Sequence, residues 1–135
     1  MKDDDNNKNR NSKLSFLSFC NVFHSNVLEN GNGGAISALG NSYVGIELST
    51  FSGNSAFNGG AIYNMGNADV NNTHFHGNSA IIGGGALYSG ASSNTKLRQS
   101  DFVKNKAGYY GEVSWRNDKA EALVFAVAIS FLTLT

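Results

Sequence analysis

Residues 51–54, Phe-Ser-Gly-Asn, and residues 59–62, Gly-Gly-Ala-Ile, form one copy of a unit that this chain of 135 residues repeats. Two further intact copies flank it, and a fourth copy has lost its Gly-Gly half. The other copies start at Phe23 and Gly33, at Phe75 and Gly84, and at Phe102. The four phenylalanines are 28, 24 and 27 residues apart (51−23, 75−51, 102−75). A fixed period of about 20–50 residues is typical of stacked repeat architectures.

The repeats lack a helical pattern. No unit shows apolar residues at i, i+3, i+4 and i+7, which disfavours helical repeats. About 24–28 residues, at about 3.3 Å per strand residue, can form one turn of three short strands and three corners. Successive turns then stack about 4.8 Å apart. The period therefore predicts an all-β parallel solenoid of about four turns.

Stacking places like residues above one another, and each repeated residue then has a structural role. The phenylalanines form an aromatic stack in the core. The asparagines satisfy backbone groups at a corner, form a ladder and tolerate its left-handed backbone conformation. The Gly pairs allow a second tight corner. The predicted structural residues are Phe23, Asn26, Gly33, Gly34, Phe51, Asn54, Gly59, Gly60, Phe75, Asn78, Gly84, Gly85, Phe102 and Asn105.

The combination of Phe-x-x-Asn with Gly-Gly-Ala-[Ile/Leu] resembles the repeat signature of chlamydial polymorphic membrane proteins and their relatives. The resemblance extends over residues 14–113. It implies a right-handed, single-stranded parallel β-helix of the pectate-lyase-like class. In the chlamydial branch it also implies surface exposure, autotransport and adhesion to host cells. Similar repeats occur in other surface and secreted proteins, so the motif indicates the fold more specifically than the function.

The two ends of the chain differ from the repeats. Residues 1–13 are polar and are predicted to be a disordered tail, followed by β-helix repeats over 14–117. Residues 118–135 are largely apolar and have three interpretations: a helical or strand cap on the solenoid, the start of a membrane span, or out-of-frame sequence. No apolar segment of a secretory leader follows Met1 directly, so we expect a piece of a longer protein.

Charge and cysteine content narrow the function classes. Ten acidic and ten basic residues give a net charge of zero, which does not favour nucleic-acid binding. The single cysteine, Cys20, follows an apolar run and is predicted to be a buried structural thiol. We expect no cofactor, and membrane association only through parts of a longer protein.

Several enzymes share the predicted fold, but their motifs are not found here. The sequence lacks the combined Asn-x-Asp, Asp-Asp, Gly-His-Gly and Arg-x-Lys motifs of polygalacturonases. Stacking could bring Glu47, Asp69 and Lys96 onto one face, which leaves a carbohydrate-active, calcium-dependent lyase as an alternative. His74 and His76 flank Phe75 and should point outward, where solvated side chains are more common than metal ligands.

The sequence thus favours a non-catalytic surface or secreted protein of adhesion type, with an extracellular or host-cell glycan or protein as its ligand. Tyr63 and Tyr88 each follow a Gly-Gly-Ala-[Ile/Leu] motif, so they should stack on one wall as candidate glycan-facing residues. Tyr43, His74 and His76 are further outward candidates. A structural spacer without activity is the remaining alternative.

Overall fold

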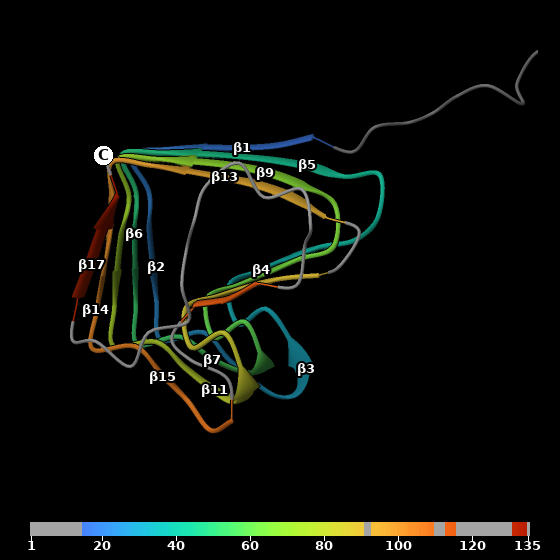
Figure 1. Ribbon diagram of the computed structural model, residues 1–135, viewed down its shortest axis with the longest axis vertical. Coiled ribbons are helices and arrows are strands. Elements are labelled where there is room, and N and C mark those ends of the chain that lie inside the picture. The colour runs from blue at the N-terminus through green and yellow to red at the C-terminus, as the bar shows by residue number, and fades with distance from the viewer. Residues whose placement is uncertain (1–14, 91–92, 110–112, 116–130, 135) are drawn as a thin grey trace, which may run out of the picture.

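The computed structural model describes residues 15–90, 93–109, 113–115 and 131–134, and the chain follows the same four-strand path in each circuit (Figure 1). The first circuit comprises β1 (Ser15–Phe19), β2 (Val22–His24), β3 (Val27–Asn32) and β4 (Ile36–Ala38). The second comprises β5 (Tyr43–Glu47), β6 (Thr50–Ser52), β7 (Ser55–Asn58) and β8 (Ile62–Asn64). The third comprises β9 (Asn67–Asn71), β10 (His74–His76), β11 (Ser79–Gly83) and β12 (Leu87–Ser89). The fourth comprises β13 (Asn94–Arg98), β14 (Ser100–Val103), β15 (Lys106–Ala107) and β16 (Val113–Trp115).

Equivalent strands of successive circuits pair in parallel and form four sheets. Sheet A has the order β1-β5-β9-β13, sheet C has β3-β7-β11-β15, and sheet D has β4-β8-β12-β16. Sheet B has β2-β6-β10-β14, to which β17 (Phe131–Leu134) adds antiparallel beside β14. The predicted all-β parallel solenoid is confirmed. The expected four turns are three complete circuits and a fourth that is described in part. The expectation of three strands per turn was wrong.

The fourth strand arises because the chain bends twice near the Phe position of each circuit, once before the Phe and once after it. Between sheets A and B, one residue per circuit has a positive φ: Cys20 at 53°, Leu48 at 49°, Asn72 at 47° and Gln99 at 47°. Between sheets B and C, the residue before each ladder asparagine does so: Ser25 at 54°, Gly53 at 63°, Gly77 at 64° and Lys104 at 56°. We expected the asparagines themselves to take this conformation, and that was wrong.

Cys20 is a second correction. Its thiol is exposed, contrary to the expected buried thiol, because the residue lies at the corner after the last inward-facing position of β1. That last inward position is Ser18, which is buried.

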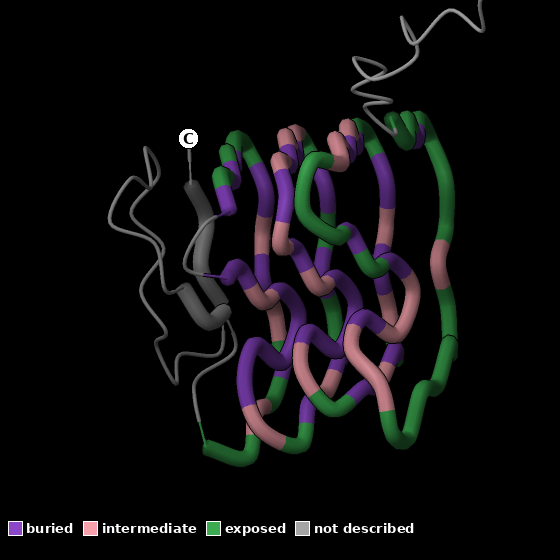
Figure 2. Tube along the Cα trace, turned by 90° about the vertical axis from the view of Figure 1, so that its right-hand side faces the viewer, coloured by how far each residue is buried: buried purple, intermediate pink, exposed green. Residues whose placement is uncertain are grey.

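The core is an aromatic stack that runs along the solenoid axis. The ring centroids of Phe23 and Phe51 are 4.5 Å apart, those of Phe51 and Phe75 are 5.0 Å apart, and those of Phe75 and Phe102 are 4.6 Å apart. Interplanar angles of 7°, 9° and 2° make the rings nearly parallel. The three later rings are fully buried, whereas Phe23 is half-buried. Figure 2 shows the same change, from buried inner coils to an exposed first coil on the right.

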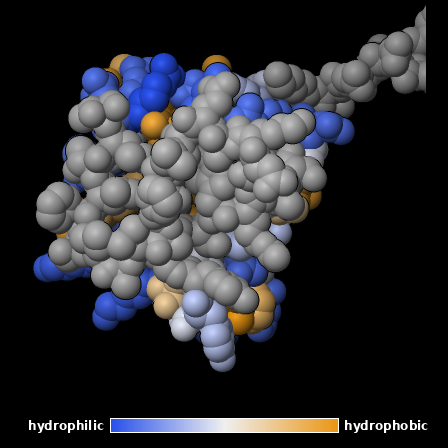
Figure 3. All heavy atoms as spheres, in the orientation of Figure 1, coloured by the Kyte–Doolittle hydropathy of each residue, from blue (hydrophilic) through white to orange (hydrophobic). Residues whose placement is uncertain are grey.

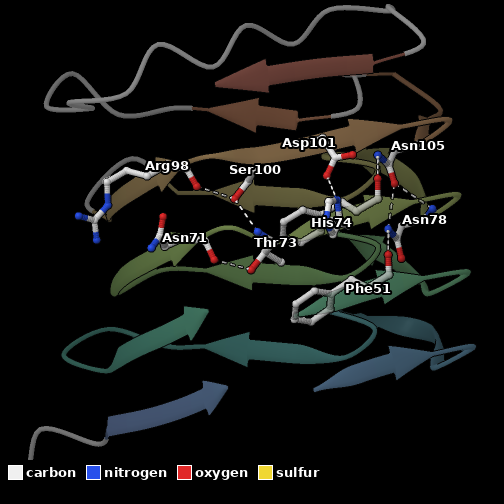
Figure 4. A network of polar contacts seen from close by, with 10 residues as sticks. Phe51, Asn71, Thr73, His74, Asn78, Arg98, Ser100, Asp101 and Asn105 are labelled. Carbon is white, nitrogen blue, oxygen red and sulfur yellow. Dashed lines mark hydrogen bonds and ion pairs between the residues drawn. The ribbon is translucent and has the colours of Figure 1, made fainter. Parts of the chain in front are cut away.

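A ladder of asparagine side chains lies beside the rings at the corner between sheets B and C. Asn54 donates from its backbone N–H (3.0 Å) and its Nδ2 (2.9 Å) to Oδ1 of Asn78. Asn78 donates in the same way to Oδ1 of Asn105 (Figure 4). Each Nδ2 also donates to the carbonyl of the Phe one coil back, so Asn78 contacts the Phe51 carbonyl at 3.0 Å. Asn54 and Asn78 have no exposed surface, so the ladder satisfies polar groups that water cannot reach.

At the corner between sheets C and D, the two glycines of the Gly-Gly pair are required for two different reasons. The first glycine of each pair has a positive φ, 62° at Gly59 and 64° at Gly84. The second lies against the backbone of the next coil. A Cβ on Gly60 would approach the Gly85 carbonyl oxygen to 2.0 Å and the Ser79 carbonyl oxygen to 2.4 Å. The motif thus sets how closely successive coils approach.

The ends of the chain are described only in part. Residues 1–13, predicted to be a disordered tail, lie outside the described residues, as do residues 118–130 of the segment predicted as a cap or a span. Within the latter, Phe131–Leu134 pairs antiparallel with Ser100–Val103 of β14. No helix in the part of the chain that the structure describes is long and apolar enough to cross a membrane.

We predict that Asn78→Ala destabilises the fold by about 3 kcal/mol or more. It removes the acceptor of the Asn54 N–H and Nδ2 and the side-chain donor to the Phe51 carbonyl, whereas Asn105 Oδ1 keeps the backbone N–H of residue 78. Each buried polar group left unpaired costs about 1–3 kcal/mol. Urea denaturation measures the change. The control is Asn58→Ala, which removes a contact of 3.0 Å to Asn32 between half-buried side chains and should cost less than about 1 kcal/mol. Equal losses in both variants would contradict the role of the ladder.

We predict that Gly60→Ala destabilises the fold by roughly 3 kcal/mol or more, because its Cβ meets rigid backbone atoms of the next coil. Gly40→Ala is the control, since a Cβ at Gly40 has no atom within 4 Å, and it should change stability by less than about 0.5 kcal/mol. Thermal unfolding of both variants tests this. A Gly60→Ala variant as stable as the parent would show that the coils can separate at this corner.

Candidate functional site

The outer face of sheet A is the most regular surface of the solenoid. Its strands pair without a register shift across five positions, so side chains align in columns along the axis. The strand alternation turns Val44, Ile46, Ala68 and Val70 into the core and leaves their neighbours outside. The outward columns are Ser15–Tyr43–Asn67–Asn94, Leu17–Gly45–Asp69–Lys96 and Phe19–Glu47–Asn71–Arg98. Figure 3 shows hydrophilic side chains along the upper rim, over this sheet.

Gly45 leaves a hollow in the middle of this face. The hollow has a volume of about 310 Å³, and its lining includes Leu17, Tyr43, Glu47, Asp69, Asn71 and Arg98. A Cβ on Gly45 would lie 2.8 Å from Leu17 Cδ2 and 3.3 Å from Tyr43 Cε1. The side chains of Leu17 and Tyr43 therefore lie close over Gly45 and line the apolar side of the hollow, while Glu47, Asp69 and Arg98 line its polar side.

The polar side of the hollow carries charges of both signs. Nη2 of Arg98 donates to both carboxylate oxygens of Asp69, at 2.8 and 2.9 Å. Nδ2 of Asn71 lies 3.5 Å from Oε1 of Glu47. Both contacts are exposed to solvent, and an exposed ion pair is worth only about 0–1 kcal/mol. These groups can therefore turn to a ligand at little cost to the fold.

The structure places the candidate lyase residues on one face, as the sequence suggested. Glu47 lies on β5, Asp69 on β9 and Lys96 on β13, with Asp69 beside Lys96 in register. However, Asp69 binds Arg98, a residue that the sequence analysis did not single out. In the described residues, no three His, Cys, Asp or Glu side chains are grouped so that they could hold a metal ion.

Tyr63 and Tyr88 stack on the outer face of sheet D. Their ring centroids are 5.2 Å apart with an interplanar angle of 14°, and the two residues are register partners on β8 and β12. Since this spacing is close to that between strands, the ring faces are turned along the solenoid axis and toward each other. Each half-buried ring therefore presents its edge to solvent, which is poorly suited to stacking a sugar on the ring face.

Burial, with a smaller contribution from the neighbouring Tyr88, raises the pKa of the Tyr63 phenol above its ordinary value of 10.0. The hydroxyl therefore stays protonated at neutral pH and can donate a hydrogen bond.

The histidines lie on the outer face of sheet B. His74 and His76 are exposed, as the alternation around Phe75 predicted. His74 Nδ1 contacts the Asp101 carboxylate (Figure 4), and His24 Nδ1 lies 2.8 Å from Ser52 Oγ. These contacts join neighbouring coils, and the three imidazoles are not gathered at a common point.

Sequence reasoning missed Gly45, Asn71 and Arg98, because none of them belongs to the repeated motifs. The available signal was their phase: Asn71 lies 24 residues after Glu47 (71−47), and Arg98 lies 27 residues after Asn71 (98−71), which are the spacings of the phenylalanines. It also missed a buried cluster at the turn from sheet D to sheet A. There Ser89 Oγ lies 2.7 Å from Thr95 Oγ1, to which Asn64 Nδ2 donates at 2.8 Å.

Comparison with known families gives a match over part of the chain. Residues 49–65 match the Chlamydia polymorphic membrane protein repeat. The matched segment extends from the corner before β6 to Met65, directly after β8, and so includes the Phe51–Asn54 and Gly59–Ile62 motifs that shape the coil. No curated protein and no solved structure matches the chain. The chain is thus a parallel β-solenoid, and one segment of it, residues 49–65, is similar to the Chlamydia polymorphic membrane protein repeat.

Proposed function

We propose that the chain is a non-catalytic binding module of a surface or secreted protein of adhesion type, and that the hollow at Gly45 receives the ligand. The repeat family supports an outer-membrane or surface location. The repeats supply a rigid wall, and the wall holds outward side chains of distant sequence positions in fixed columns. The hollow on sheet A is the single observation that carries the proposal.

The lining of the hollow indicates the chemistry of the ligand. Binding sites are concave, with apolar surface and a few polar groups that fix orientation, and their volumes start at about 300 Å³. At about 310 Å³, this hollow accommodates one sugar unit or one protein side chain. The Tyr43 ring offers an apolar contact, while Glu47, Asn71 and Arg98 offer acceptors and donors for hydroxyl or amide groups. An extracellular or host-cell glycan, or a protein with an exposed polar side chain, fits this set.

The placement of the carboxylates favours binding over catalysis. General acid–base catalysis needs carboxyl groups held beside the reacting bond in an environment that tunes their proton affinity. Glu47 and Asp69 lie on adjacent strands in different columns, and each has a non-acidic hydrogen-bond partner. Solvent reaches both groups. A calcium-dependent lyase remains the alternative that the binding experiment can detect.

We predict that Gly45→Val abolishes ligand binding without loss of stability. Valine fills the hollow, and it favours a strand more than glycine does. Leu17 Cδ2, the nearest atom to the new Cβ, is the end of a flexible side chain and can move. A glycan array and immobilised extracellular proteins measure binding by the parent chain and the variant, and thermal unfolding measures stability.

Ser37→Val is the matched control, because Ser37 is an exposed outward position on β4 of sheet D. It should bind as the parent does. If Gly45→Val retains binding and the double variant Tyr63→Ala, Tyr88→Ala loses it, the binding site lies on sheet D and not on sheet A. Absence of any ligand would overturn the proposed function, and cleavage of polyuronate with Ca²⁺ would favour the lyase.

A further inference from the structure

The first coil exposes much more apolar surface than the others. Of the eleven large apolar side chains that are exposed in the described residues, seven belong to residues 16–39. They are Phe16, Leu17, Phe19, Val22, Val27, Leu28 and Leu39. Figure 2 shows this coil as the mostly exposed one at the right-hand end of the stack. Large exposed apolar patches mark sites of association.

This end also leaves the internal ladders incomplete. In the inner coils, each asparagine Oδ1 accepts two hydrogen bonds from the coil before it, but Asn26 Oδ1 accepts none from the described residues. Phe23 stacks on Phe51, and its other face has no aromatic partner in the part of the chain that the structure describes. The open end contains a cavity of about 500 Å³ with a largely apolar lining that includes Phe16, Phe23 and Ala35. The end face is thus continuous with the hydrophobic core.

The four strands of the first coil are sheet edges, and nothing in their sequence prevents pairing. β1, β2, β3 and β4 each stand at the end of a sheet. Natural proteins protect such edges with lysines, prolines or bulges. Residues 15–39 contain one charged residue, Glu29, if histidine is neutral, and the chain contains no proline. The zero net charge of the chain adds no repulsion between copies.

Of the four edges, β1 is best suited to accept another strand. It pairs with β5 over all five of its residues without a shift, whereas β3 carries an irregularity between Leu28 and Asn32. β2 and β4 have only three residues each. At the other end of the stack, β17 pairs antiparallel with β14, so this solenoid tolerates an antiparallel strand on a parallel sheet.

We propose that two copies of this chain associate through the first coil, with β1 of one copy antiparallel to β1 of the other. A two-fold dimer brings the same surface of both subunits together, and an edge strand then meets its own copy antiparallel. Full overlap of the five residues places Leu17 opposite Leu17, and Ser15 opposite Phe19. Sheet A then continues across both copies, and the apolar end faces shield each other from water. The proposal does not depend on the proposed function.

The oligomeric state of the full chain tests the proposal. Light scattering after gel filtration, over a wide range of concentrations, should show a dimer that dissociates on dilution. The double variant Leu17→Lys, Val22→Lys should be a folded monomer, because these two exposed positions of the first coil become charged. Ile81→Lys, at an exposed apolar site on β11, should remain dimeric. Circular dichroism shows whether each variant is folded.

Cys20 provides a test of the strand register, since it is the only cysteine and it is exposed. Cys20 lies three residues after Leu17, so the two labelled positions are six residue spacings apart along the strand direction. At about 3.4 Å per residue, a pair of spin labels should be separated by about 20 Å, plus the length of the labels. A monomeric parent chain, a dimer unaffected by the double lysine variant, or a much longer label distance would each overturn the proposal. A monomer would indicate a further coil of a longer chain as the partner of this face.

Discussion

The asparagine ladder is the interaction on which the rest of the structure depends. Each corner between sheets B and C buries backbone groups that no strand can pair, and the side chain of the next asparagine satisfies them. Because one Oδ1 accepts two hydrogen bonds from the same neighbouring residue, the ladder allows one register between coils. The stacked phenylalanines fill the space beside it, but apolar contacts alone tolerate slippage. Directional hydrogen bonds fix the register, and burial supplies most of the stability.

Because the register is fixed, the outward side chains of successive coils form regular rows and columns on the surface of the solenoid. Tyr43, Gly45 and Glu47 lie on one strand, while Asp69 and Arg98 come from the next two coils. None of these residues is near the others in sequence except within a strand. The hollow on sheet A lies beside Gly45, and the residues that line it come from four successive coils. Tyr63 and Tyr88 differ from the residues of the hollow, because they are like residues in register and their rings stack on each other. Their ring faces are therefore not available to a ligand.

The two ends of the stack show what happens where the repeat stops. In the inner coils, every asparagine and phenylalanine has a partner on both sides. Among the described residues, Asn26 and Phe23 have a partner on one side only, and the apolar surface around them is exposed. Beside β14, an antiparallel strand covers the edge of sheet B. A solenoid cannot satisfy its own terminal coils, so its ends are natural places for caps or partners.

The sequence by itself determined the parallel solenoid, the aromatic stack and the ladder, because a repeated period forces like residues into contact whatever the details of the path. It could not determine the four-strand cross-section, since Cys20, Leu48 and Gln99 take a positive φ that their residue types do not favour. It also missed the exposure of Cys20 and the contact between Asp69 and Arg98. Those features depend on the direction in which each corner turns the following strand. Only the tertiary structure fixes that direction, because it comes from hydrogen bonds between coils and not from neighbours along the chain.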